Sequence, residues 1–161
     1  MMRRTATAAV LLAALALAPA CDSGEAERPS FRVDVTGAVE ATLTGRPRVG
    51  VFEDRTATVY TFVLQSDFLT SVGLSVEGPP RVGTFSAGGS VLNVFAGEGA
   101  GFFVADGGEI AVESVEDGLV RARFAFDASE GFDGGGRRVR VEGEMLADLD
   151  DRIPVPPLPQ P

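Results

Sequence analysis

Residues 119–128 read Leu119-Val120-Arg121-Ala122-Arg123-Phe124-Ala125-Phe126-Asp127-Ala128. Small and apolar side chains fill the even-numbered positions, while arginine and aspartate take three of the odd-numbered ones. A period of two is typical of a β-strand that buries one face in a core. This stretch therefore predicts a strand with an apolar inner face and a charged outer face.

The preceding segment, residues 109–115, predicts the first strand that pairs with it. Glu116-Asp117-Gly118 is typical of a three-residue hairpin loop with Gly118 in the left-handed region. Such a loop fixes which residues of the two strands lie opposite each other. The predicted pairs are Ile110 with Phe124, Val112 with Ala122, and Glu113 with Arg121.

The following segment, residues 138–149, predicts the second partner, and charge selects its register because the connecting loop is long. One register sets Arg123 opposite Arg140, which is repulsive. The neighbouring register on the same face replaces that contact with opposite charges, each pair worth about 0.2–1 kcal/mol. We predict the second register, which pairs Arg123 with Glu142, Arg121 with Glu144, Asp127 with Arg138, Phe124 with Val141 and Phe126 with Val139.

Similar alternation upstream predicts an all-β chain. We expect one long strand over residues 31–44 with a bend at Gly37, and Gly78-Pro79-Pro80 ends a later strand because proline cannot serve a central ladder. Eight to ten strands with glycine-rich turns are typical of a β-sandwich or barrel, and we expect an antiparallel β-sandwich over residues 31–149. The other expected strands are 49–52, 58–65, 69–77, 82–85, 91–96 and 101–105.

Composition supports one domain with a substantial core. All 11 phenylalanines lie between Phe31 and Phe132, and each can bury about 150–250 Å². The adjacent Phe102 and Phe103 must face opposite sides of a strand, so we expect one of them near the surface. The net charge of −9 argues against nucleic acid and against direct binding to anionic lipid.

The first 20 residues predict a signal peptide. A basic start, Met1–Arg4, precedes an apolar run of about 13 residues and the small-residue segment Ala18-Pro19-Ala20. The apolar run is too short to span a bilayer, which takes about 20 residues. The chain is therefore expected to be exported.

The segment Leu17-Ala18-Pro19-Ala20-Cys21 resembles the lipobox of bacterial lipoproteins, in which the cysteine is diacylated and becomes the new N-terminus. That family prefers leucine at the place that Ala18 holds here. The resemblance implies a lipid on Cys21 and a tether over residues 21–30, so that the membrane is a partner through the N-terminal lipid. The alternative is a secreted protein with a free terminal thiol, since a single cysteine has no disulfide partner.

The residue types argue against most catalysis. The chain has no histidine and no lysine, so the usual bases for a nucleophile are missing, and we expect neither enzyme activity nor a cofactor. A hydrolase that works through two carboxylates on an envelope or extracellular substrate is the catalytic alternative. The outer arginines Arg121, Arg123, Arg138 and Arg140 are expected to form a neutralised ladder and not an anion-binding patch.

Two acidic clusters are candidates for calcium, which takes six to eight oxygen ligands. Asp127, Glu130 and Asp133 lie around a glycine-rich loop, but they lack the spacing of an EF-hand, so we expect a solvated acidic loop. A calcium-steadied adhesion domain is the alternative. The second cluster, Asp148, Asp150 and Asp151, leads into residues 150–161, which we expect to be a disordered proline-rich tail without ladder bonds from Ile153 onward.

The strand patterning also resembles that of small, uncharacterised bacterial lipoproteins with a single β-sandwich domain. The resemblance implies a β-sandwich and a location in the cell envelope, on the periplasmic side or at the cell surface, and it implies no activity. We therefore expect a non-enzymatic module that binds or scaffolds a protein or polymer partner at a membrane surface. The segments that carry the resemblance are Gly83-Thr84-Phe85, residues 107–112, residues 118–126 and residues 139–143.

Overall fold

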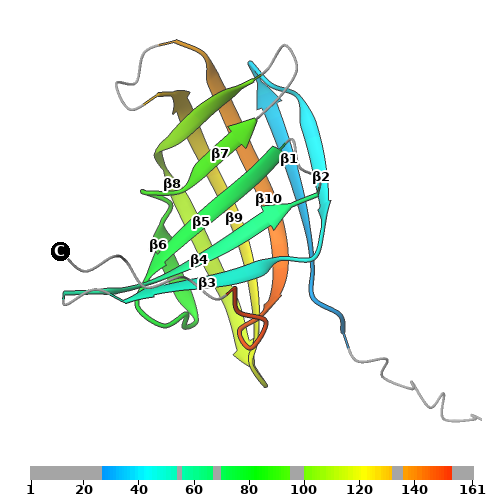
Figure 1. Cartoon of the computed structure of the whole chain (residues 1–161), viewed down its shortest axis with the longest axis vertical. Helices are drawn as coiled ribbons and strands as arrows, with labels where there is room; N and C mark the ends of the chain where they lie inside the picture. The colour runs from blue at the N-terminus through cyan, green and yellow to red at the C-terminus, as the bar shows by residue number, and fades with distance from the viewer. Residues whose placement is uncertain (1–26, 54–55, 67–69, 95–99, 132–135, 154–161) are drawn as a thin grey trace, which may run out of the picture.

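The computed structural model describes residues 27–53, 56–66, 70–94, 100–131 and 136–153. Within these ranges the chain forms ten β-strands, as expected for an all-β protein (Figure 1). Among the same residues there is no helix with the length and hydropathy to cross a bilayer. The strands are β1 (Ser30–Gly37), β2 (Ala41–Gly45), β3 (Arg48–Glu53), β4 (Thr58–Gln65), β5 (Thr70–Glu77), β6 (Gly83–Ser86), β7 (Val91–Val94), β8 (Gly101–Glu116), β9 (Leu119–Glu130) and β10 (Arg138–Asp148).

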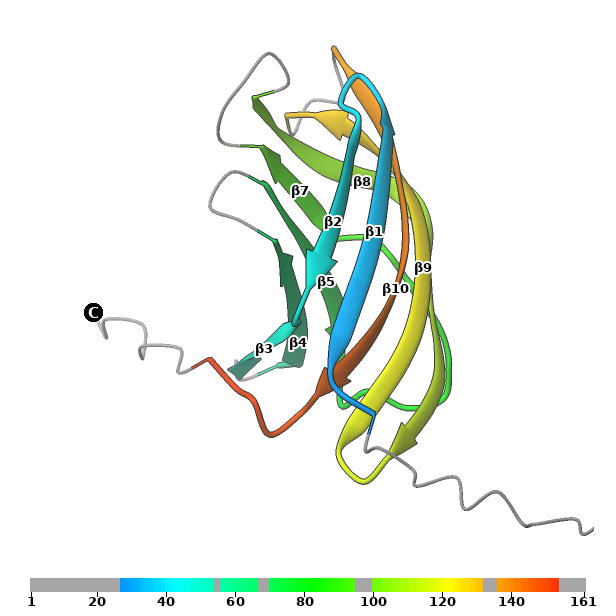
Figure 2. The ribbon, with the colours of Figure 1, turned by 90° about the vertical axis from the view of Figure 1, so that its right-hand side faces the viewer.

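All ten strands belong to one antiparallel sheet. Nine follow the order β2-β1-β10-β9-β8-β7-β5-β4-β3, and β6 pairs separately with β8. Figure 2 shows that the sheet is curled, so that β3, β4, β5 and β7 lie across from β1, β2, β9 and β10. β8 belongs to both halves, because it pairs with β7 of one half and with β9 of the other.

The core lies between the two halves of the curled sheet. Phe62 of β4, Phe103 of β8 and Phe126 of β9 are fully buried there. The predicted inner face of β9 is confirmed, since all five of its even-numbered residues from Val120 to Ala128 are buried. Phe103 is buried while Phe102 is half-buried on the outer face, as their adjacency requires.

The segments 101–105 and 109–115, expected as separate strands, are continuous in β8. A register shift between Ala105 and Gly107 marks a bulge in its pairing with β9. Gly108 follows the bulge with φ +135°, and a Cβ on it would lie 2.3 Å from the carbonyl oxygen of Ala125 and 2.5 Å from the Cα of Phe126. Glycine is therefore required at position 108, where the backbone of β9 comes close.

The hairpin between β8 and β9 differs from the prediction at its tip. Its loop has two residues, Asp117 at φ 50° and Gly118 at φ 79°, the signs that a type I′ turn requires. A second register shift, between Val112 and Ser114, offsets the shorter loop. The predicted pairs Ile110–Phe124 and Val112–Ala122 are therefore confirmed, whereas Glu113–Arg121 is wrong because Arg121 lies opposite Ser114.

The register between β9 and β10 is shifted by two residues from the predicted one. Arg123 lies opposite Glu144, and Phe124 lies opposite Gly143. A Cβ on Gly143 would lie 2.5 Å from the carbonyl oxygen of Arg32 in β1 and 2.7 Å from Cζ of Phe124, so glycine is required at this position. The repulsive Arg123–Arg140 pair is avoided, because Arg140 faces Asp127. The pairs Arg123–Glu142, Arg121–Glu144, Asp127–Arg138, Phe124–Val141 and Phe126–Val139 are wrong.

Residues 31–44 form a hairpin and not one bent strand. Gly37 adopts φ +106°, and the amide of Ala38 donates to the carbonyl oxygen of Arg138 at 2.9 Å. The chain then reverses, so that β1 lies between β2 and β10. Glycine at position 37 supplies the left-handed conformation at which the strand ends.

The segment after β10 returns to the edge of the sheet at β3. The amide of Val49 donates to the carbonyl oxygen of Asp151 at 3.3 Å, and the amide of Ile153 donates to that of Val49 at 2.8 Å. The prediction that Ile153 makes no ladder bond is therefore wrong. Residues 154–161 of the predicted tail lie outside the described residues, as do the predicted signal peptide and Cys21.

Candidate functional site

The outer face of β1, β10, β9 and the second part of β8 is charged. Along a row across the strands, Arg32 lies opposite Glu144, which lies opposite Arg123. In another row, Arg140 lies opposite Asp127. We call this surface the charged face; its members are Arg32, Asp34, Glu109, Glu113, Arg121, Arg123, Asp127, Arg138, Arg140, Glu142 and Glu144.

Ion pairs neutralise much of the charged face. Nη1 of Arg140 lies 3.1 Å from Oδ2 of Asp127, and its Nε lies 2.8 Å from Oε1 of Glu142. The hydrogen bond to Glu142, and then that to Asp127, raises the pKa of Arg140. Nε of Arg123 lies 3.2 Å from Oε1 of Glu113. Arg123 and Arg140 are thus neutralised as predicted, although only Asp127 is a partner that lies directly opposite its arginine in the observed register.

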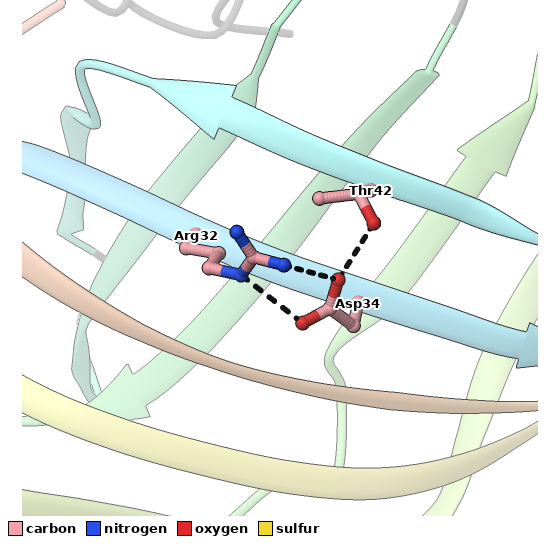
Figure 3. Close-up of polar contacts among 3 residues, drawn as sticks. All are labelled: Arg32, Asp34 and Thr42. Carbon is pink, nitrogen blue, oxygen red and sulfur yellow. Dashed lines mark hydrogen bonds and ion pairs between the residues drawn. The ribbon is translucent and has the colours of Figure 1, made fainter.

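A smaller cluster on the same face joins β1 to β2 (Figure 3). Oγ1 of Thr42 donates to Oδ1 of Asp34 at 2.6 Å, and Nε of Arg32 donates to Oδ2 of Asp34 at 3.3 Å. The hydrogen bond from Thr42 lowers the pKa of Asp34; burial opposes this, and Arg32 adds to it. These contacts link edge strand β2 to its neighbour.

A groove of about 210 Å³ opens at one end of the charged face. Carboxylates and arginines alternate along its wall, with Arg121 paired to Glu27 and Arg123 paired to Glu113. The ion pair with Glu27 raises the pKa of Arg121. A carboxylate hydrolase needs two carboxyl groups on opposite sides of its substrate. In this groove the carboxylates of Glu27 and Glu113 each contact an arginine.

The described residues of the first calcium cluster each pair with an arginine. Asp127 pairs with Arg140, Glu130 pairs with Arg137, and Asp133 lies outside the described residues. In the second cluster, Asp148 accepts a hydrogen bond from the amide of Asp150, and Asp151 pairs with Arg46. Within the described ranges, no group of three or more His, Cys, Asp or Glu side chains is placed to hold a metal ion.

Arg137 connects β8, β9 and β10, a role that the sequence did not reveal. Its Nε donates to Oε2 of Glu130 at 3.0 Å, and its Nη2 donates to the carbonyl oxygen of Ala100 at 2.6 Å. The guanidinium also lies 5.5 Å from the ring centroid of Phe103. Glycine at position 101 leaves room for it, because a Cβ there would lie 2.7 Å from Nη2.

This junction predicts acid sensitivity. The hydrogen bond from Arg137 lowers the pKa of Glu130, and burial partly opposes it. A carboxyl whose folded-state pKa is lowered stabilises the fold above its unfolded value, about 4.3, and loses that contribution as the pH falls through the folded value. We expect the difference in melting temperature between the parent chain and Glu130→Gln to shrink as the pH is lowered from 6 to 2.5. Exposed Glu40, changed to Gln, is the control; a constant difference for Glu130→Gln would contradict the prediction.

The outer face of the other half of the sheet differs from the charged face. We call it the neutral face; its centre holds hydroxyl, glycine and valine residues, and Oγ of Thr61 and Ser75 lie 3.5 Å apart. Arg48 and Glu77 lie at its ends, and Phe52 is 50 % exposed. Its members are Gly50, Phe52, Val59, Thr61, Val63, Ser71, Gly73, Ser75, Val91, Asn93, Phe102 and Val104.

Comparison of the chain with models of known families, with curated proteins and with solved structures finds no match.

Proposed function

We propose that this chain is a non-enzymatic binding module that is exported and held at a membrane surface by a lipid on Cys21. Residues 1–20 support export, and the lipobox-like segment that ends at Cys21 supports lipidation. Residues 22–30 span at most about 30 Å when extended, so the folded part stays close to the headgroups. In this proposal the two halves of the sheet act as the layers of a β-sandwich around their shared core.

The neutral face is the observation that carries the binding role. The chain has a net charge of −9, yet the centre of this face is uncharged and Phe52 is exposed on it. The cores of protein interfaces are depleted in charged residues and enriched in aromatic ones. The partner is therefore a protein whose contact surface is also low in charge.

The charged face supports the assignment of the binding role to the neutral face. Arg123 is paired with Glu113 of β8, and Arg140 is paired with Asp127 of β9 and Glu142 of β10. Paired surface charges contribute little to stability, about 0–1 kcal/mol each, but they keep a surface hydrated. In this proposal the charged face stays exposed to solvent, and the neutral face binds the partner.

The anchor is tested by replacing Cys21. We expect Cys21→Ser to move the protein from the membrane fraction to the soluble fraction, because the acyl chains supply about 0.8 kcal/mol per buried methylene. Fractionation and mass spectrometry of the mature N-terminus provide the measurement, with Ser23→Ala as the control. An unmodified Cys21 in the membrane-bound parent would refute the lipid anchor.

The binding face is tested by adding one charge. We expect Thr61→Arg, at the centre of the neutral face, to weaken partner capture from envelope extracts at least tenfold, about 1.4 kcal/mol, because an unpaired charge would be buried in the interface. Thr84→Arg adds the same side chain at an exposed position of β6 and is the control. Circular dichroism confirms that both variants fold. Equal capture by both variants would remove the neutral face from the proposal.

A further inference from the structure

The neutral face carries two charged residues that lie on opposite sides of its centre. Arg48 is at one corner of the area formed by β3, β4 and β5, which lie side by side (Figure 1), and Glu77 is at the opposite corner. Thr61 lies midway between them. The outer residues of the three strands form the rows Arg48-Val63-Gly73, Gly50-Thr61-Ser75 and Phe52-Val59-Glu77.

Arg48 and Glu77 do not neutralise each other within one molecule. Strands about 4.8 Å apart, with about 3.4 Å per residue, separate the two positions by about 17 Å. Both side chains are exposed, and in the part of the chain that the structure describes neither has an ion-pair or side-chain hydrogen-bond partner. The face therefore presents one positive and one negative charge, each free to pair with an opposite charge on a bound surface.

We propose that the partner of the neutral face is a second copy of this chain, bound face to face about a twofold axis that passes over Thr61. This inference rests on the binding role proposed for the neutral face. In such an interface each copy contributes the same surface, and residues on one side of the axis meet those from the other side. An axis perpendicular to the line from Arg48 to Glu77 sets Arg48 of each copy against Glu77 of the other. Both charges are then paired.

The same axis runs close to the other two corners of this area, Phe52 and Gly73. A residue near a twofold axis meets its own counterpart, so the half-exposed ring of Phe52 packs against Phe52 of the second copy. Aromatic pairs stabilise an interface beyond the area that they bury. At Gly73 and at Thr61 the residues are small, which lets the two sheets approach to the spacing of stacked sheets, about 10 Å. The strands of the two copies cross steeply, as in the orthogonal class of sheet packing.

A second copy fits this face better than an unrelated surface does. Its own neutral face is low in charge, as the proposed partner surface must be, and it supplies the opposite charge at both corners. Charge pairs of this kind determine orientation more than affinity, whereas like charges brought together are strongly unfavourable. Since most of the contacting side chains are small, we expect a weak dimer with a dissociation constant of about 10–100 µM.

Sedimentation velocity of the full chain in detergent, over a range of chain concentrations, tests the proposal. We expect Arg48→Glu and Glu77→Arg each to raise the dissociation constant of the dimer at least tenfold, because each variant creates two like-charge contacts. The double variant exchanges the two charges and is expected to return the constant to within threefold of the parent value. Glu40→Arg makes the same charge change as Glu77→Arg at an exposed position outside the neutral face, and is expected to change the constant less than twofold.

Circular dichroism confirms that the variants fold. A parent chain that stays monomeric at several hundred micromolar would overturn the proposal. A dimer that neither single variant weakens, or that the double variant does not restore, would overturn it as well. The proposed function fails separately: a monomeric chain whose capture of another protein is lost in Thr61→Arg would keep the binding face and replace the second copy by that protein.

Discussion

Changing Gly108 to alanine is expected to lower the free energy of unfolding by about 3 kcal/mol or more. The new Cβ would lie 2.3 Å from the carbonyl oxygen of Ala125 and 2.5 Å from Cα of Phe126, and both are backbone atoms of β9 that cannot swing away. The positive φ of 135° adds strain that an alanine side chain rarely accepts. Overpacking and backbone strain each cost about 1–3 kcal/mol.

The neighbouring glycine supplies the control for this prediction. A Cβ on Gly107 would meet no atom within 4 Å, so Gly107→Ala is expected to change the free energy of unfolding by less than about 1 kcal/mol. Urea unfolding followed by circular dichroism measures both variants. Similar losses for the two glycines would mean that β8 does not approach β9 as described.

Phe62→Ala is expected to cost about 3–5 kcal/mol. The side chain is fully buried on β4, and its removal leaves a cavity between the halves of the sheet. Phe52→Ala makes the same change on the adjacent strand, where the ring is 50 % exposed, and is expected to cost less than about 1 kcal/mol. Thermal and urea unfolding of the two variants give the comparison, and equal costs would contradict the assigned inner and outer faces.

The alternation of apolar and polar side chains predicted most of the strands, because residues at every second position of a strand share a face. It could not predict how the strands close around the core. A sandwich of two sheets and one curled sheet both bury every second residue, so the pattern is the same for each. The hairpin at residues 31–44 was missed for a related reason, since alternation continues across Gly37 in either arrangement.

The strand registers were harder to predict, because they also depend on which side chains fit opposite one another. The pattern of charged residues does not show this. The pairing of Arg123 with opposite charge is satisfied in two registers, and the observed one places Gly143 where the ring of Phe124 and the backbone of β1 leave no room for a side chain. At the other hairpin, Asp117-Gly118 suits loops of two or three residues. The bulge near Glu113 shifts the register by one residue, so the pairs beyond it match those predicted for the longer loop.

The surface was predicted in part. Alternation placed the arginines on the outer face, and the argument from charge pairing predicted that they are neutralised, although its register was wrong. The exposure of Phe52 was not predicted, because phenylalanine is usually buried and only the tertiary structure shows which face it takes. The contacts of Arg137 join residues that are far apart in sequence, from Ala100 to Glu130. Contacts between residues so far apart produce no local sequence pattern from which they could be predicted.

The pairing of β1 with β10 means that the sheet cannot finish folding until the last strand has been made. Phe31 near one end of the described chain lies opposite Met145 near the other. A polypeptide that emerges N-terminus first, from a ribosome or through a translocation pore, carries β1 and β2 out before their neighbour exists. Until β10 has emerged, the β1–β2 hairpin lacks its neighbour in the sheet, and the apolar side of β1 stays exposed. Chains with such distant pairings fold slowly and gain from protection by chaperones along the way.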